Sequence, residues 1–585
     1  MAQKGIKNKI DWENPEDRRV FLHSASHILA MAVKELWPEV ELAIGPAIED
    51  GFYYDFDKKE PFTPDDLRKI EKKMWGIVQK DTPFEKKEVS KKEALKLFKN
   101  HPYKTELINE LKERISVYSN GNFYDLCSGP HIKSTGMVKA YRLMKVSGSY
   151  WRGDSKNKAL QRIYGIAFPE KQMLKDYLNL LQEAERRDHR RIGKQMDLFS
   201  FHEEGPGFPF FHNNGIIIWN ELMGFWREEH KKAGYLEVKT PMILSRNLWE
   251  QSGHWDHYKE NMYFTKIDNQ DYAVKPMNCP GGMLIYMEKV HSYRELPLRM
   301  AEVGLVHRHE LSGVLAGLFR VRAFTQDDAH IYMTENQIKD EVIGVINLVD
   351  KFYKVFGLGY HVELSTMPKN HIGTTKMWRN AEKSLENALK SIKMDHKINP
   401  GDGAFYGPKI DFHVRDALGR RWQCATIQLD FAMPEKFDLS YEGQDGRKHR
   451  PVMIHRVVYG AIERFLGILI EHYAGKFPLW LAPVQARVLT VADRFSKYAK
   501  EIADELKEAG IRAELDNRTE SVGYKVRQAQ LEKVPLIVNI GEKEEKNKTI
   551  AVRTLDGKVQ FGIKLDNFIE KITQNIREKK RNIEF

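Results

Sequence analysis

The stretch from Tyr177 to Ile192 has the spacing of a helix but is strongly charged and polar on most sides. Helices of this kind typically run through solvent between domains. The breaker segment Gly205–Pro209, Gly-Pro-Gly-Phe-Pro, follows soon after. At 585 residues the chain also exceeds the size that one hydrophobic core can organise. The sequence therefore predicts several domains, two of them joined by a helix.

A second change in composition lies at Pro478–Pro483, an apolar segment flanked by prolines. Beyond it, strand and helix patterns alternate from Ala486 to Arg577, which is typical of a small α/β domain. The N-terminal region mixes strand-like pieces with lysine-rich helical stretches. We therefore expect domains at residues 1–172, 191–480 and 481–585, with a linker helix at 173–190.

The net charge of +11 favours a polyanionic partner, although a lysine-rich surface that promotes solubility explains it as well. No apolar run approaches the roughly 18 residues of a membrane span. The lysine-containing N-terminus lacks the apolar segment of a secretory signal. Three cysteines form no disulfide framework, which fits a reducing compartment. We expect a cytoplasmic protein with no membrane partner.

Two arginines stand inside otherwise apolar segments, where a surface ion pair is a poor explanation for them. Arg308 precedes a carboxylate in Arg-His-Glu, and Arg464 ends the apolar run that begins at Gly460. Guanidinium groups match phosphate oxygens with paired hydrogen bonds, so both are expected to bind one polyphosphate. The sequence contains no Gly-x-x-x-x-Gly-Lys-Ser/Thr, so it is not that of a P-loop enzyme.

These arginine segments, with Gln326–His330 and Met277–Pro280, resemble the catalytic core of class II aminoacyl-tRNA synthetases, specifically the threonyl-tRNA synthetase family. The resemblance runs over nearly the whole chain. It implies an α+β multidomain fold: a mostly antiparallel catalytic sheet of about six or seven strands flanked by helices, an N-terminal α+β editing domain and a C-terminal α/β anticodon-binding domain. The run around Pro241 resembles the family's dimer-forming motif, so we expect a homodimer.

The implied reaction is ATP-dependent attachment of L-threonine to tRNA(Thr) through threonyl adenylate, with Mg²⁺ accompanying ATP. Arg308 and Arg464 are the expected catalytic groups, on the α- and γ-phosphates. Glu310 is expected to accept from the adenine amino group, and Phe324 to stack under the ring. The full set expected at ATP is Arg308, Glu310, Arg320, Phe324, Gln423 and Arg464.

Cys279, His330 and His455 are too far apart in sequence for any spacing rule to make them a metal site. The resemblance places each at a Zn²⁺ ligand position, with a fourth coordination position open to the amine and hydroxyl of threonine. Valine offers no such oxygen, and a site that demands a polar contact rejects its isostere by on the order of 10⁴ or more. The residues expected to contact threonine are Gln326, Asp328, Tyr406 and Gln428.

Three details of this cleft are specific to the sequence. Gln423 and Gln428 are an odd number of residues apart on one predicted strand, so alternation predicts opposite faces. Ala461 and Gly282 stand where the family commonly has serine and histidine, which suggests a looser substrate pocket. Cys424 is interpreted as a packing residue.

Serine is smaller than threonine and keeps the hydroxyl, so the pocket is expected to reject it only about 10- to 200-fold. A second, hydrolytic site for seryl-tRNA(Thr) is therefore expected. His23 and His27 lie at i and i+4, on one face of a predicted helix. A metal site and a water-activating cluster without metal are both open for this group. The residues that match the family's editing domain are His23, His27, Lys104, Asp125, Cys127 and His131.

The segment after Pro483 resembles the family's anticodon-binding domain, and Lys533, Glu544 and Arg553 are expected to face the anticodon loop. The chain begins only about twenty residues before His23, so we expect the family's ubiquitin-like N-terminal domain to be missing from it. Three alternatives remain: a synthetase-like RNA-binding paralogue, a zinc hydrolase acting on aminoacyl-tRNA, and a synthetase for proline or serine.

Overall fold

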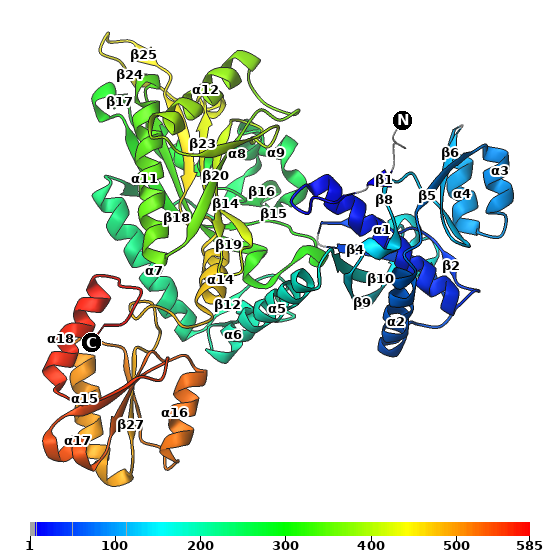
Figure 1. Cartoon of the computed structure of the whole chain (residues 1–585). Helices are drawn as coiled ribbons and strands as arrows, with labels where there is room; N and C mark the ends of the chain where they lie inside the picture. Colours follow the sequence, from blue (N-terminus) through cyan, green and yellow to red (C-terminus); the bar gives the residue numbers. More distant parts are fainter. Residues whose placement is uncertain (1–5, 8, 50, 113, 585) are drawn as a thin grey trace. The chain divides into compact units, whose positions relative to one another are not determined.

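The computed structural model describes residues 6–7, 9–49, 51–112 and 114–584. Residues 1–5 and 8, on which the secretory-signal prediction depends, lie outside this part. The chain forms two compact units, Met1–Gln182 and Glu183–Phe585 (Figure 1). None of the helices in the described ranges is both long enough and apolar enough to traverse a bilayer.

The N-terminal unit is built around helix α1 (Pro15–Leu36). Pro15 begins the helix, and the Asn14 side chain accepts hydrogen bonds from two backbone N–H groups of the first turn. The apolar side chains of α1 pack into one core with α2 and with the main sheet of this unit. The other elements are α2 (Pro64–Lys80), α3 (Lys91–Leu97), α4 (Pro102–Glu110), β1 (Ile6–Lys7) beside β8 (His131–Ile132), a sheet of β2 (Glu41–Leu42), β3 (Ala47–Ile48), β4 (Gly51–Asp57), β10 (Ala159–Phe168) and β9 (Ala140–Tyr150), and a sheet of β5 (Glu85–Val89), β6 (Ile115–Asn120) and β7 (Phe123–Leu126).

The single bridging helix predicted over 177–192 is interrupted in the structure. Helix α5 (Lys171–Arg187) has no buried residue, as a solvated helix requires. The chain then breaks at Asp188, whose carboxylate caps α6 (His189–Gln195). His189 and Ile192 are buried in the second unit, and His189 Nδ1 lies 2.7 Å from Glu471 Oε1. The last four residues of the predicted helix, 189–192, are therefore part of a folded core.

The second unit contains an eight-stranded sheet, one strand more than the largest number predicted. Its interior pairs are antiparallel, and only the two edge pairs are parallel, which confirms the predicted mixed, mostly antiparallel type. Helices α7 (Asn213–Lys232), α11 (Ile338–Phe356), α12 (Thr375–Ser391) and α14 (Ile462–Tyr473) share its large apolar core. The strand order is β13 (Leu236–Glu237), β18 (Leu298–His307), β19 (Ala323–Met333), β26 (Val452–Val457), β23 (Arg421–Asp430), β22 (Lys409–Arg415), β20 (Gly359–Ser365) and β21 (His396–Asn399).

Smaller elements surround this sheet. Helix α10 (Cys279–Met287) packs with a small apolar cluster that includes Met300 of β18 and Tyr332 of β19. The others are β14 (Ile243–Ser245), β16 (Gln270–Val274) and β15 (Tyr263–Ile267) in one sheet, β17 (His291–Ser292), β24 (Tyr441–Glu442) and β25 (Lys448–His449) in another, the pair β11 (Phe199–Ser200) and β12 (Phe210–Phe211), and the helices α8 (Arg246–Gln251), α9 (His254–His257) and α13 (Ala432–Lys436).

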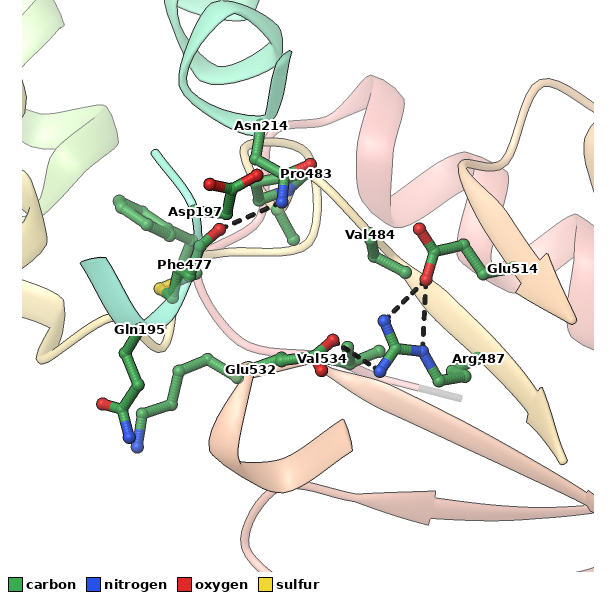
Figure 2. Close-up of a pocket in the computed structure, with 13 residues that line it drawn as sticks. Gln195, Asp197, Asn214, Phe477, Pro483, Val484, Arg487, Glu514, Glu532 and Val534 are labelled. Carbon is green, nitrogen blue, oxygen red and sulfur yellow. Dashed lines mark hydrogen bonds and ion pairs between the residues drawn. The ribbon is translucent and has the colours of Figure 1, made fainter. Parts of the chain in front are cut away.

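The C-terminal part of the same unit is the α/β arrangement expected from its alternating pattern, with its own apolar core. Arg512 pairs with Glu221 of α7 at 2.6 Å. A cavity of about 290 Å³ lies beside this contact region, where Arg487 bridges Glu514 and Glu532 (Figure 2). The elements are the sheet β28 (Ala513–Asp516), β27 (Ala486–Thr490), β29 (Leu536–Ile540), β30 (Ile550–Thr554) and β31 (Val559–Ile563), with α15 (Ser496–Glu508), α16 (Val522–Leu531), α17 (Glu542–Asn547) and α18 (Leu565–Arg577).

Candidate functional site

The sheet brings together the three residues that the sequence separates most widely. His330 in β19 and His455 in β26 are direct cross-strand partners, and Cys279 is the first residue of α10. One ligand atom from each lies within 4.8 Å of those of the other two, and all three residues are buried. A shared metal centre is therefore geometrically possible, which the spacing of these residues could not show.

The chemistry of these donors fits Zn²⁺. Burial lowers the pKa of His330 to about 4, so its ring is neutral at pH 7, and its buried Nε2 has no hydrogen-bond partner among the described residues. Asp430 Oδ2 lies 2.8 Å from His455 Nε2. This contact fixes the imidazole ring and leaves Nδ1 as the nitrogen that can bind a metal ion. Burial raises the pKa of the Cys279 thiol, and a bound divalent ion offsets this by deprotonating it.

A cavity of about 200 Å³ opens beside Cys279 and His455. Within it, Asp328 accepts a hydrogen bond from Asn278 Nδ2 at 3.2 Å, and the Tyr406 ring lies 5.1 Å from that of His455. Carboxylate, phenol and amide groups thus surround the candidate metal position on one side. All four residues predicted to contact threonine line this cavity: Gln326, Asp328, Tyr406 and Gln428.

A second cavity, of about 240 Å³, shares Arg308 with the first. The Arg308 guanidinium lies 4.9 Å from the Phe324 ring centre, and Arg464 Nε donates to Phe319 O at 3.0 Å. Burial lowers the pKa of Arg464, but a guanidinium stays charged at neutral pH. The lining of this second cavity includes every residue predicted to bind ATP: Arg308, Glu310, Arg320, Phe324, Gln423 and Arg464.

The prediction that Gln423 and Gln428 lie on opposite faces is wrong. The register of β22 and β23 pairs Asp411 with Thr426 but His413 with Gln423, so β23 contains one extra residue between these pairs. Such a bulge returns the side chain to the original face. Gln423 Nε2 accordingly lies 3.3 Å from Thr426 Oγ1, and Thr426 lines both cavities.

The two departures from the family pattern occupy different places. Ala461 lines the second cavity, named the nucleotide cavity below because it holds the residues predicted to bind ATP, and forms an isolated bridge with Gln326. A Cβ on Gly282 would lie 3.4 Å from His330 Nδ1, an ordinary packing distance. Ala461 therefore borders a cavity and Gly282 packs beside a candidate metal ligand, and neither residue replaces a metal donor. Cys424 is buried in the core of the unit, as expected of a packing residue, and also borders the nucleotide cavity.

The N-terminal unit brings all six predicted editing residues together. His23 and His27 on α1 meet Cys127 and His131, and one ligand atom from each of these four lies within 4.8 Å of the others. Cys127 Sγ is 3.5 Å from His23 Nε2 and 3.3 Å from His131 Nε2. Burial lowers the pKa of His23 to about 4 and raises that of Cys127 to about 12. Without a metal, the cluster therefore contains neutral imidazoles and a protonated thiol.

The two remaining editing residues form a buried pair beside the histidines. Lys104 Nζ lies 2.5 Å from Asp125 Oδ1, and Asp125 Oδ2 is 3.5 Å from His27 Nδ1. Tyr54 donates to Asp125 at 2.7 Å and receives a hydrogen bond from Lys104 at 3.1 Å. Tyr54 was not predicted from the sequence, although it stands in a strand-like aromatic run whose alternation points it to one face.

The structure does not gather the three predicted anticodon residues. Lys533 precedes β29 and is one of the residues that line the cavity beside Arg487. Glu544 lies after the other end of β29, in α17, where its side chain accepts from Gly541 N. Arg553 is in β30, opposite Ile537. The cavity beside Lys533 is lined by residues from both sides of the predicted boundary at 480/481, so Lys533 has less structural support as an RNA contact than Glu544 and Arg553.

Two buried carboxylates that position the cleft were not identified from sequence. Asp327 accepts hydrogen bonds from the N–H groups of Val458, Tyr459 and Gly460, which ties β19 to the turn before α14. Asp430 orients His455. An acidic residue inside an apolar strand is the signal that could have found both, since an unpaired buried charge is costly.

Glu463 is a third buried carboxylate, and its pKa yields a test of the fold around Arg464. Burial raises this pKa to about 8, so the folded state holds a proton that the unfolded state releases near pH 4.5. Stability from this group is complete below pH 4.5 and is lost as the pH rises to about 8.

Glu463→Gln removes the titration. We therefore expect the free energy of unfolding of this variant, relative to that of wild type, to rise by on the order of 1.4 kcal/mol per pH unit between these two pH values. Thermal unfolding at several pH values measures this, with the exposed Glu435→Gln as control; parallel profiles for the Glu463→Gln variant and wild type would contradict it.

Comparison with known proteins identifies related families for three segments. Residues 263–473 match the class II core domain of the tRNA synthetases for G, H, P, S and T. Residues 485–575 match an anticodon binding domain, and residues 115–164 match the threonyl and alanyl tRNA synthetase second additional domain. The three matched segments contain the residues that line the two cavities, most of the C-terminal α/β part, and strands β7 and β8 on either side of Cys127.

Whole-chain relatives are also found. The chain is 60% identical over 585 residues to a threonine–tRNA ligase of Carboxydothermus hydrogenoformans. The aligned region covers 99% of this chain and 92% of the relative. It is 58% identical to one from Caldanaerobacter subterraneus subsp. tengcongensis, covering 99% and 90%. A crystal structure of the RNA binding domain of threonyl-tRNA synthetase from Cryptosporidium parvum covers 66% of this chain and 98% of its own, with 41% identity and a TM-score of 0.63.

Proposed function

This chain belongs to the threonine–tRNA ligase family, and from that premise we propose which of its residues perform each part of the reaction. Membership excludes a synthetase for proline or serine. The proposal concerns the roles of individual side chains, the metal, and the second site in the N-terminal unit.

Cys279, His330 and His455 hold one Zn²⁺, and the carboxylate of Asp430 keeps the His455 ring in place. When bound, zinc supplies a Lewis-acidic coordination position for the amine and hydroxyl of threonine. We assign contacts with the amine and hydroxyl of threonine to the four residues that line the cavity beside Cys279 and His455: Gln326, Asp328, Tyr406 and Gln428. This pocket discriminates against valine, which leaves the polar groups unpaired.

Arg308 and Arg464 carry the phosphate chemistry. Arg308 borders both cavities, so it can contact the α-phosphate and the attacking carboxylate at once. Arg464 neutralises the far end of the triphosphate, with Mg²⁺ accompanying ATP. Phe324 stacks with the adenine ring, and Glu310 accepts from the adenine amino group after releasing Arg320, which it pairs with at 2.9 Å in the free protein.

The observation that carries this proposal is the joining of two cavities at Arg308, one lined by zinc donors and the other by arginines. Pyrophosphate exchange tests it, because exchange requires an adenylate. We expect exchange with threonine, weaker exchange with serine and almost none with valine. An RNA-binding paralogue or a zinc hydrolase would show no exchange with any of the three.

The six-residue cluster of the N-terminal unit is the hydrolytic site for seryl-tRNA(Thr). In the cluster without metal, Cys127 keeps its proton and is not an activated thiolate, so we assign the attack to a water molecule. A neutral histidine can accept the water proton, and the Lys104–Asp125–Tyr54 network fixes His27. The four ligand atoms also suit a metal, which would activate water in the same place.

His27→Ala is expected to slow hydrolysis of seryl-tRNA(Thr) by on the order of 10²-fold or more. Threonine activation should stay unchanged, because the catalytic cleft lies in the other unit. Deacylation of purified seryl-tRNA(Thr) and misacylation with serine measure the two effects. His101→Ala is the matched control, since His101 belongs to the same unit but pairs with Glu41 outside the cluster. Normal deacylation by the His27→Ala variant would disprove the assignment.

The C-terminal part, residues 481–585, is proposed to bind the anticodon arm of tRNA(Thr), with Arg553 and Glu544 as its contacts and Lys533 as a weaker candidate. The division into residues 1–172, 173–190, 191–480 and 481–585 remains a proposal, as do the homodimer and the cytoplasmic location. The anticodon assignment is supported by the matched domain over residues 485–575.

A further inference from the structure

A third cluster of metal-type donors lies in the catalytic sheet, separate from the Cys279 group. His361 in β20 and His413 in β22 are direct cross-strand partners, and Glu363 lies two residues along β20 on the same face. The two imidazole rings stack with centres 4.9 Å apart and planes 18° apart. One ligand atom from each of the three residues lies within 4.8 Å of the others. Two strands therefore present two imidazoles and a carboxylate to one point.

The distances in this cluster fit a bridging cation better than direct hydrogen bonds. His361 Nε2 is 3.5 Å from Glu363 Oε1, and His413 Nε2 is 3.4 Å from Glu363 Oε2. Hydrogen bonds to a carboxylate are shorter, about 2.7–2.9 Å. Ligands placed about 2.0–2.1 Å from a tetrahedral ion are separated by about 3.3–3.4 Å. The cluster is therefore spaced like a coordination shell.

The hydrogen bonding around His361 leaves it available as a ligand. Both of its ring nitrogens are buried and without a hydrogen-bond partner among the described residues. The neighbouring Asp411, by contrast, is fully engaged by Ser365, Lys409, Gln423 and Thr426.

The donor set indicates which ion would bind. Two imidazoles with one carboxylate suit Zn²⁺ and other late first-row divalent ions, whereas Mg²⁺ prefers oxygen ligands. Each of the three side chains is about one-fifth exposed, which leaves a side open for water as a further ligand. Asn399 Nδ2 lies 3.4 Å from Glu363 Oε2 and can hold the carboxylate in position.

We propose that His361, Glu363 and His413 form a second divalent transition-metal site in the catalytic unit, in which the ion joins strands β20 and β22. His413 is the register partner of Gln423, a residue of the nucleotide cavity wall. An ion at this point therefore stabilises the strand pair that presents Gln423. The site is independent of the zinc assigned to threonine recognition, because the two share no ligand.

Cobalt titration of the metal-free full chain tests this site with Co²⁺ as the only added ion. Wild type is expected to bind one equivalent more than the His361→Gln/His413→Gln double variant. The sulfur-to-cobalt absorption, which reports on Cys279 and on any ion held by the Cys127 cluster, is expected to stay the same in both proteins. His396→Gln, on the adjacent strand β21 and outside the cluster, is the matched control and should bind as wild type does.

Equal cobalt stoichiometry in wild type and a folded double variant would overturn the proposal. If circular dichroism shows that the double variant does not fold, the isosteric Glu363→Gln variant replaces it. That variant is expected to bind the extra equivalent at least tenfold more weakly, and wild-type affinity for all equivalents would overturn the proposal. Loss of the sulfur-to-cobalt band in all proteins would instead count against the assignment of Cys279, so the two proposals fail in distinguishable ways.

Discussion

Cys279→Ser is expected to lower kcat/KM for threonine-dependent pyrophosphate exchange by about 10³-fold or more, with loss of the zinc bound in the cleft. Cys279 supplies the only thiolate of the cluster, and its removal leaves two imidazoles on adjacent strands. A site that has lost its metal cannot offer a coordination position to the hydroxyl, so its preference for threonine over valine should fall as well.

Cys424→Ser is the matched control for this prediction. Cys424 is also buried in the second unit, but among the described residues it belongs to no cluster of metal donors. We expect this variant to retain zinc and to activate threonine within about tenfold of wild type. Metal analysis of both variants and exchange with threonine and valine provide the measurement. Full threonine activation by zinc-free Cys279→Ser would refute the role of the metal.

Arg464→Ala is expected to lower kcat/KM for ATP by on the order of 10²- to 10³-fold, with much less effect on threonine affinity. The Arg464 guanidinium lines the nucleotide cavity but does not line the cavity beside Cys279 and His455. Its loss removes a charge from the triphosphate while the threonine pocket keeps its side chains. Steady-state exchange with ATP and threonine varied separately distinguishes the two affinities.

Arg447→Ala provides the control, because Arg447 is an exposed arginine of the same unit, in the turn between β24 and β25. This change also lowers the net charge by one but touches neither cavity, so its kinetics should match wild type. An equal loss in both arginine variants would show that overall charge, not the position of Arg464, causes the effect.

Most residues of the cleft could be predicted because each lies in a short motif that matches the family pattern. Cys279, His330 and His455 show the limit of spacing rules, since their convergence depends on the cross-strand pairing of β19 with β26. That pairing is a property of the whole sheet. Only the resemblance could supply it from sequence.

The errors have local physical causes. Alternation along a strand placed Gln423 on the wrong face because a single extra residue in β23 reverses the pattern. The predicted charged helix ran past the end of α5 because Asp188, which caps α6 in the structure, was counted as part of one continuous polar helix. Charge alone could not tell α5 from α6, because burial of α6 depends on contacts with α14 far along the chain.

Other parts had no usable sequence signal. The buried hydrogen bonds between Asp327 and the turn before α14 join residues that are 131 to 133 positions apart in the sequence. The stacked pair of His361 and His413 likewise requires the register of β20 against β22. Single histidines in strands are common in cores, and neither residue stood out before the sheet was known.

Anomalous diffraction from crystals of the full chain, recorded on both sides of the zinc absorption edge, tests the central claim most directly. We predict a zinc peak within bonding distance of Cys279 Sγ and of one ring nitrogen each of His330 and His455, with a threonine analogue completing the coordination when it is added. Absence of a zinc peak between these three residues in zinc-replete crystals would contradict the account.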